Sequence, residues 1–106
     1  MTARERLPQR RRCETLSFAL GGLLYQATVG YYPDGRVGEI FLNGAKLNSD
    51  TDTSARDSAI MASFALQHGA ELECLRSACT RAADGSADGP LGKLLDLLTH
   101  PRLVRP

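Results

Sequence analysis

The sequence has no tryptophan, and its only aromatic residues are three tyrosines and three phenylalanines. It has just two histidines and three cysteines, so the residue types that most often act in acid–base catalysis, nucleophilic catalysis and zinc binding are scarce. No apolar run approaches the ~18 residues of a membrane span, and no apolar stretch follows the basic start as it would in a signal peptide. An odd number of cysteines suits a reducing compartment. These absences favour a cytoplasmic protein without contact to a membrane.

With 106 residues, the chain has room for one domain and is too short for a barrel or doubly wound fold of ~200 residues. Its 42% hydrophobic and 24% charged residues are ordinary for a folded protein, so disorder is not expected. We expect a single domain over residues 13–99, between a basic arm at 1–12 and a short tail at 100–106.

The formal net charge of +1 hides an asymmetry. Residues 1–12 carry five arginines against one glutamate, whereas the rest of the chain carries eight basic residues against eleven acidic ones. Such an arm can be a solvated tail, or it can dock on a polyanion or an acidic partner. It has no aromatic residues for base stacking, which speaks against sequence-specific binding of single strands. The candidate docking residues are Arg4, Arg6, Arg10, Arg11 and Arg12.

Three segments in the first half alternate between apolar and polar residues, at 14–20, 23–32 and 37–42. The first two are separated by Gly21-Gly22, a signature of a tight hairpin. The second and third are separated by Pro33-Asp34-Gly35-Arg36, which has turn residues in the right order. The pattern predicts a three-stranded antiparallel meander.

The second half has helical periodicity. A polar cluster at 48–54 offers several N-caps, and Ser54 with Asp57 forms a weakened capping box. The segment 59–66 is apolar almost all round, which predicts a central, buried helix ended by Gly69.

A second helix is expected over 71–79, with Leu72, Leu75 and Cys79 on one face, and a third begins at Pro90. Strands followed by helices indicate an α+β two-layer sandwich, in which about three helices cover one face of the sheet.

The loop after the third strand is a candidate anion or nucleotide site, because it leads into the N-terminus of the first helix. It lacks the glycine and lysine spacing of a P-loop, and three nearby aspartates would repel phosphate. Ordinary helix capping is the alternative. The candidate residues are Gly44, Lys46, Asn48, Ser49 and Thr51.

Several single residues have structural interpretations. Cys74 and Cys79 are five apart on a predicted helix, which separates their Cα atoms by ~8–9 Å and disfavours a disulfide. Neither zinc nor another metal is expected, and His68 is interpreted as a helix cap. Glu39 is expected to be solvated. Alternation places Tyr25 and Tyr31 in the core and turns Tyr32 outward.

Three segments resemble the TSCPD-type domain, which lies near the C-terminus of adenosylcobalamin-dependent (class II) ribonucleotide reductases and also occurs in small stand-alone bacterial proteins. The resemblance covers roughly residues 6–98. The segments are Arg6-Leu7-Pro8-x-Arg10-Arg11, Gly30-x-Tyr32-x-Asp34-Gly35-Arg36-x-Gly38-Glu39-Ile40-Phe41 and Ala65-Leu66-Gln67-His68-Gly69.

The chain departs from that family in two ways. The eponymous Thr-Ser-Cys-Pro-Asp string is absent, and the nearest stretch is Ser77-Ala78-Cys79-Thr80-Arg81. The radical-bearing barrel cannot fit in this length, so the cobalamin and the catalytic residues that the resemblance implies would belong to a separate catalytic domain. We therefore expect no cofactor and no catalytic residue in this chain.

The resemblance implies an accessory or regulatory binding module linked to deoxynucleotide metabolism and DNA replication, with a reductase subunit as its protein partner. One alternative is a nucleic-acid-associated protein that binds through the arginine arm. Another is a reductase component that acts only together with a catalytic subunit. A homo-oligomer is also expected, because an uncovered sheet exposes a face and edges.

Overall fold

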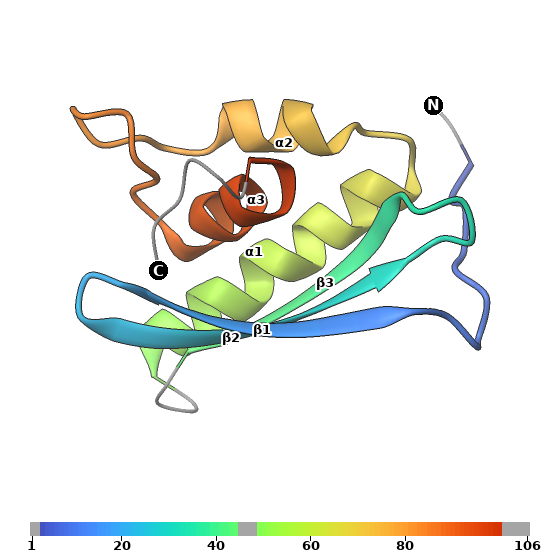
Figure 1. Ribbon diagram of the computed structural model, residues 1–106, viewed down its shortest axis with the longest axis horizontal. Coiled ribbons are helices and arrows are strands. Elements are labelled where there is room, and N and C mark those ends of the chain that lie inside the picture. The colour runs from blue at the N-terminus through green and yellow to red at the C-terminus, as the bar shows by residue number, and fades with distance from the viewer. Residues whose placement is uncertain (1–2, 45–48, 101–106) are drawn as a thin grey trace.

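The computed structural model describes residues 3–44 and 49–100. The three strands pair antiparallel in the order β1-β2-β3, and three helices follow, so the expected α+β fold is confirmed (Figure 1). The elements are β1 (Cys13–Leu20), β2 (Leu23–Tyr31), β3 (Val37–Gly44), α1 (Asp50–Gln67), α2 (Leu72–Ala78) and α3 (Pro90–Thr99). Within the described ranges, no helix is both long and apolar enough to cross a membrane.

Glycines form the two turns of the meander. Gly21 and Gly22 have φ values of 59° and 79°, and Gly35 has a φ of 93°. All three lie in the left-handed region, which side chains with a Cβ atom disfavour. The register between β2 and β3 shifts between Gly30 and Tyr31.

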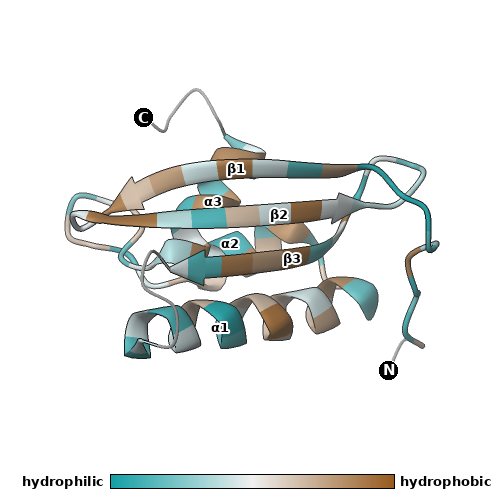
Figure 2. Ribbon diagram, turned by 90° about the horizontal axis from the view of Figure 1, so that it is seen from below, coloured by the Kyte–Doolittle hydropathy of each residue, from teal (hydrophilic) through white to brown (hydrophobic). Residues whose placement is uncertain are grey.

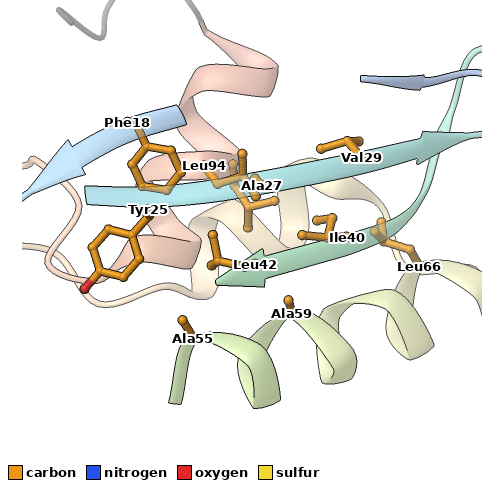
Figure 3. Close-up of a cluster of buried hydrophobic side chains, with 11 residues drawn as sticks. Phe18, Tyr25, Ala27, Val29, Ile40, Leu42, Ala55, Ala59, Leu66 and Leu94 are labelled. Atoms are coloured by element: carbon orange, nitrogen blue, oxygen red, sulfur yellow. The ribbon is translucent and has the colours of Figure 1, made fainter. Parts of the chain in front are cut away.

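The core lies between the sheet and the helices (Figure 3). Alternate residues of β2 and β3 point into it, and Leu94 and Leu95 of α3 are fully buried against them. In Figure 1, all three helices lie on the same side of the sheet. The expected coverage of one face is therefore confirmed.

The expectation for the first helix was wrong in two respects. α1 begins at Asp50, and the side chain of Ser49 accepts the N–H of Asp52 at 3.1 Å, so Ser54 lies inside the helix and is no cap. The helix is also not buried all round, because three of its large apolar side chains are exposed. These are Ile60, Met61 and Phe64. The central, fully buried leucines belong to α3 instead.

α1 runs alongside β3, the last strand of the sheet (Figure 2). Three of its polar side chains bind main-chain groups that β3 directs away from β2. The Gly44 N–H donates to Asp52 Oδ1 (2.9 Å), the Ile40 N–H donates to Ser63 Oγ (2.8 Å), and Gln67 Nε2 donates to the Gly38 carbonyl (3.0 Å). The β3 edge of the sheet is therefore covered, and these main-chain groups of Gly38, Ile40 and Gly44 have partners.

Asp96 of α3 connects α2 and the following loop to α3. Arg76 Nε donates to its Oδ1 at 2.8 Å, and Arg81 Nη1 donates to its Oδ2 at 2.6 Å. The neighbouring Arg81 guanidinium lowers the pKa of Asp96 below its usual range, despite the opposing effect of burial.

Candidate functional site

Residues 3–12, which we call the strap, lie against the end of the sheet where β2 passes into β3 (Figure 1). The Glu5 N–H donates to the Gln67 carbonyl at 2.6 Å, and the Glu5 carbonyl accepts the Tyr32 hydroxyl at 2.5 Å. Arg4 Nε donates to Gln67 Oε1 at 2.6 Å. The interpretation of this segment as a solvated tail is thus corrected, because backbone and side-chain hydrogen bonds hold it on the body.

Glu39 anchors the strap from the sheet. It is only 8% exposed and forms an ion pair with Arg11, so the expectation of a solvated side chain was wrong. A buried carboxylate needs such a partner, because leaving water costs it several kcal/mol. The Glu39 side chain lies over Gly30, where an added Cβ would come 2.7 Å from its Cγ. Glycine at position 30 therefore makes room for the anchor.

Tyr32 is buried at 4% exposure, contrary to the expectation that it faces outward. The register shift after Gly30 breaks the strand alternation on which that expectation rested. The ring lies against Gly38, where an added Cβ would be 2.7 Å from Tyr32 Cε2 and 2.8 Å from Leu7 Cδ2. Burial, followed by the nearby Glu5, raises the pKa of the Tyr32 hydroxyl.

The three segments that carry the family resemblance meet at the strap. Arg11 comes from the first segment, Glu39 from the second and Gln67 from the third, and each bonds to another of these segments or to an adjoining strap residue. Gly30 and Gly38 of the second segment permit this close approach. The shared motifs therefore form one structural cluster rather than three separate sites.

A cavity of about 440 Å³ lies between the strap and the β2–β3 turn. Three consecutive arginines line it: Arg10, Arg11 and Arg12. Arg11 is held by Glu39, and the guanidinium of Arg12 lies 4.2 Å from the ring centre of Tyr31. Cation–π stacking occupies the face of a guanidinium and leaves N–H donors at its rim.

The five predicted docking arginines thus differ in their surroundings. Arg4 stacks on Phe64 with 4.8 Å to the ring centre, while Arg6 and Arg10 are exposed and contact no partner within the described part of the chain. Binding of a polyanion or a protein partner by these residues stays a prediction.

The described residues of the predicted anion site, Gly44, Ser49 and Thr51, lie at the opposite end of the sheet. Lys46 and Asn48 fall outside the described residues. Ser49 caps α1, as the alternative of ordinary helix capping predicts. The N–H of Gly44 is bonded to Asp52. Thr51 lines a cavity of about 600 Å³. Anion binding here stays a prediction.

This second cavity, which we call the hydroxyl cavity, differs chemically from the one beneath the strap. It lies between β2 and the three helices and is lined by Thr51, Ser54, Ser58, Thr80 and Asp50 among others, and its described lining residues include no lysine, arginine or histidine. Such a lining offers hydroxyls and one carboxylate but no cation to balance a phosphate.

The cysteines and histidines assemble no reactive group among the described residues. Cys74 is exposed and Cys79 is half-buried, and both are free thiols. Burial raises the pKa of Cys79, which keeps the thiol protonated and unreactive. His68 forms the C-cap of α1. Residues 3–44 and 49–100 contain no cluster of three or more potential metal ligands.

The described cavities do not suit cobalamin. Their volumes are about 600, 490, 440 and 170 Å³, and no histidine lines any of the four. Drug-sized ligands already occupy cavities of ~300–1,000 Å³, and a corrin ring with its amide arms is larger than such ligands.

The chain is similar to several curated proteins named vitamin B12-dependent ribonucleotide reductase. That of Rhodopirellula baltica is 39% identical over 72 residues, which is 68% of this chain and 7% of the relative. Those of Bradyrhizobium diazoefficiens and Streptantibioticus cattleyicolor are 36% and 39% identical over 73 and 70 residues, which is 69% and 66% of this chain and 6% and 12% of the relatives.

No family model matches the chain, and no solved structure does so. Because the matched segments are 7% and 6% of the first two relatives, the chain spans only a small fraction of the length of these curated proteins. It is homologous to a short segment of vitamin B12-dependent ribonucleotide reductases, which confirms the resemblance carried by its motifs.

Proposed function

We propose that this chain is a non-catalytic accessory module of ribonucleotide reduction, which binds a separate reductase subunit in the bacterial cytoplasm and so serves deoxynucleotide supply for DNA replication. The observation that carries the proposal is the convergence of all three shared segments on the strap. These residues hold a binding surface in place, and their polar groups are bonded to one another.

Two features support a binding role over a catalytic one. The carboxylate of Glu39 is paired with Arg11, so it is not presented to a substrate as a free base. Burial raises the pKa of the Cys79 thiol, which makes it a poor nucleophile. We propose that cobalamin and the radical chemistry reside on the partner.

The chemistry of the strap cavity favours an acidic protein surface as the ligand. Arg10 and Arg12 present N–H donors that match carboxylates in pairs. A nucleic acid would in addition use aromatic faces for stacking. Here Arg12 covers Tyr31, Arg36 covers Tyr32 and Arg4 covers Phe64. Because these faces are occupied, we favour the protein partner over the nucleic-acid alternative.

The test is direct binding of the full chain to purified B12-dependent reductase from the same organism, measured by calorimetry. Replacing Arg10 and Arg12 together by alanine should weaken binding at least tenfold. Arg56→Ala on α1 removes another exposed arginine, away from the strap, and should leave binding unchanged.

Three results would contradict the proposal. Absence of binding to the reductase would exclude the partner, and nucleotide reduction by the isolated chain would exclude a non-catalytic role. Tight, strongly salt-dependent binding to DNA or RNA that is lost in the double variant would support the nucleic-acid alternative instead.

A further inference from the structure

The two edges of the sheet differ in whether another element of the fold covers them. The β3 edge is covered by α1, whose side chains bind the main-chain groups of Gly44, Ile40 and Gly38. No element of the described chain adds a strand or a helix along the β1 edge in this way (Figure 2). An unpaired edge is a template for another strand.

The register shows which groups of β1 point outward. The Tyr31 N–H donates to the Arg12 carbonyl, and the antiparallel pairing continues without a shift to Leu20 and Leu23. Even-numbered residues of β1 therefore bond to β2, and odd-numbered residues direct their N–H and C=O groups away from the sheet. Agreeing with this, the carbonyl of Ala19 accepts a hydrogen bond from Lys93 Nζ at 2.6 Å.

The middle of this edge carries none of the usual protection. Within residues 3–44 and 49–100, we find no partner for the main-chain groups of Thr15 and Ser17. Residues 13–20 contain no proline, lysine or arginine and no bulge. The one charged side chain, Glu14, accepts the Tyr31 hydroxyl near the end of the strand. Proteins that keep such an edge free normally guard it with charge, proline or a bulge.

We propose that this edge is a homodimer interface, in which β1 of one chain pairs antiparallel with β1 of a second copy and the two sheets join into one of six strands. The two-fold axis of this dimer passes between Leu16 of one copy and Leu16 of the other. Thr15 then lies opposite Ser17 of the other copy, and these outward-facing residues exchange four main-chain hydrogen bonds across the axis.

The side chains of β1 are self-complementary in this register. The two copies of Leu16, each half-buried at the rim of its own core, meet at the axis and cover one another. Glu14 lies opposite Phe18 of the other copy, so the two glutamates are ~13 Å apart and do not repel at short range. On the uncovered face, Thr15 and Ser17 are small and polar and do not clash.

A second copy is favoured over a foreign strand because the edge matches itself. A two-fold axis at Leu16 pairs residues 14–18 of the two copies and sets no like charges opposite each other. Ala19, whose carbonyl accepts Lys93 Nζ, lies outside this paired stretch. Joining the edges also leaves the strap free, because β1 runs from the strap toward the hairpin at Gly21 and the axis lies near its middle.

Analytical ultracentrifugation of the full chain, from low micromolar to several hundred micromolar, tests the proposal. The wild type should sediment as a concentration-dependent dimer. Thr15→Pro and Ser17→Pro remove outward N–H groups that the monomer does not use, so each should leave the chain folded by circular dichroism and monomeric throughout. A wild type that stays monomeric at all these concentrations would overturn the proposal, as would a dimer that survives both prolines.

Two further variants keep the result interpretable if a proline unfolds the chain. Ser17→Lys places a charge at the edge, and Gln26→Lys places the same charge on the same face at its partner position in the central strand. The first should weaken the dimer at least tenfold and the second should not. Equal weakening by both would locate the contact on the open face and overturn the edge proposal.

Discussion

Arginines have different roles at the junction of α2 and α3 and at the strap. At the junction of α2 and α3, Arg76 and Arg81 both bind Asp96, so their guanidinium groups are paired within the fold. At the strap, Arg11 binds Glu39 in the same way, but Arg12 stacks on Tyr31 instead. A guanidinium bound to a carboxylate holds elements together, whereas one stacked on a ring keeps N–H donors for a ligand.

Within a few residues, the strap therefore combines an arginine that holds the fold together (the structural half) with arginines whose N–H donors are available to a ligand (the available half). Arg11 fixes the position of the segment, and its neighbours Arg10 and Arg12 line the cavity. The α2–α3 junction has only the structural half. If this contrast is correct, changes at the anchors should affect stability, and changes at Arg10 and Arg12 should affect binding alone.

The largest expected effect is that of Gly30→Ala. The new Cβ would lie 2.7 Å from Glu39 Cγ and 2.9 Å from its Cδ, so the anchor must move and Arg11 loses its partner. Overpacking of this kind typically costs 1–3 kcal/mol, and the lost ion pair places the expected destabilisation near ~3 kcal/mol, measured by urea unfolding.

A double-mutant cycle separates steric overlap from a backbone effect. Glu39→Ala removes the atoms that the new Cβ would meet, so Gly30→Ala should cost far less in that background. An equal cost in both backgrounds would mean that glycine is needed for another reason, and the anchor account of the shared motif would be wrong.

The next effect concerns the α2–α3 junction and is a pH dependence. The folded pKa of Asp96 is lowered from 3.8 by Arg81, so its stabilising contribution is full above that value and is lost as the pH falls below it. Asp96→Asn should lower the free energy of unfolding by ~2 kcal/mol at neutral pH, because the hydrogen bonds from Arg76 and Arg81 lose their charged acceptor.

Urea unfolding between pH 2.5 and 7 checks this. The stability of the wild type should fall more steeply below about pH 4 than that of Asp96→Asn, and the two curves should converge at the acid end. Parallel curves over the whole range would show that Asp96 is not the group that couples the junction to pH.

The sheet and its turns could be predicted because their signals are local. Alternation and the Gly21-Gly22 pair mark the meander, and leucines at helical spacing mark α3. α1 was harder, because Asp52 and Ser63 face an edge strand and not solvent, so polar residues occupy its inner face. A polar inner face beside apolar outer residues hides the amphipathic pattern that sequence reasoning uses.

The strap could not be placed from sequence, because its contacts are non-local and follow no period. Arg11 and Glu39 are 28 positions apart, and Arg4 and Gln67 are 63 apart. The available signal was a glycine on each of two predicted strands, Gly30 and Gly38, since glycine inside a strand often marks a close approach. That signal indicates that something packs there but does not identify the segment.

The smallest expected effects on stability are at Arg12 and Arg10, and they test the contrast between anchors and ligand-binding arginines most sharply. Arg12 is exposed and its stacking on Tyr31 contributes ~0.5–1 kcal/mol at such sites. Arg12→Ala should therefore lower the free energy of unfolding by less than ~1 kcal/mol, and Arg10→Ala should not change it measurably, because exposed, unpaired side chains contribute little. Arg12→Lys keeps the charge but loses the planar stacking group, so it should cost no more stability than Arg12→Ala and should lose part of the binding to the reductase partner. A loss of stability at Arg12 comparable to that at Gly30 would show that the stacked arginine is an anchor too, and the division of the strap into a structural and an available half would fail.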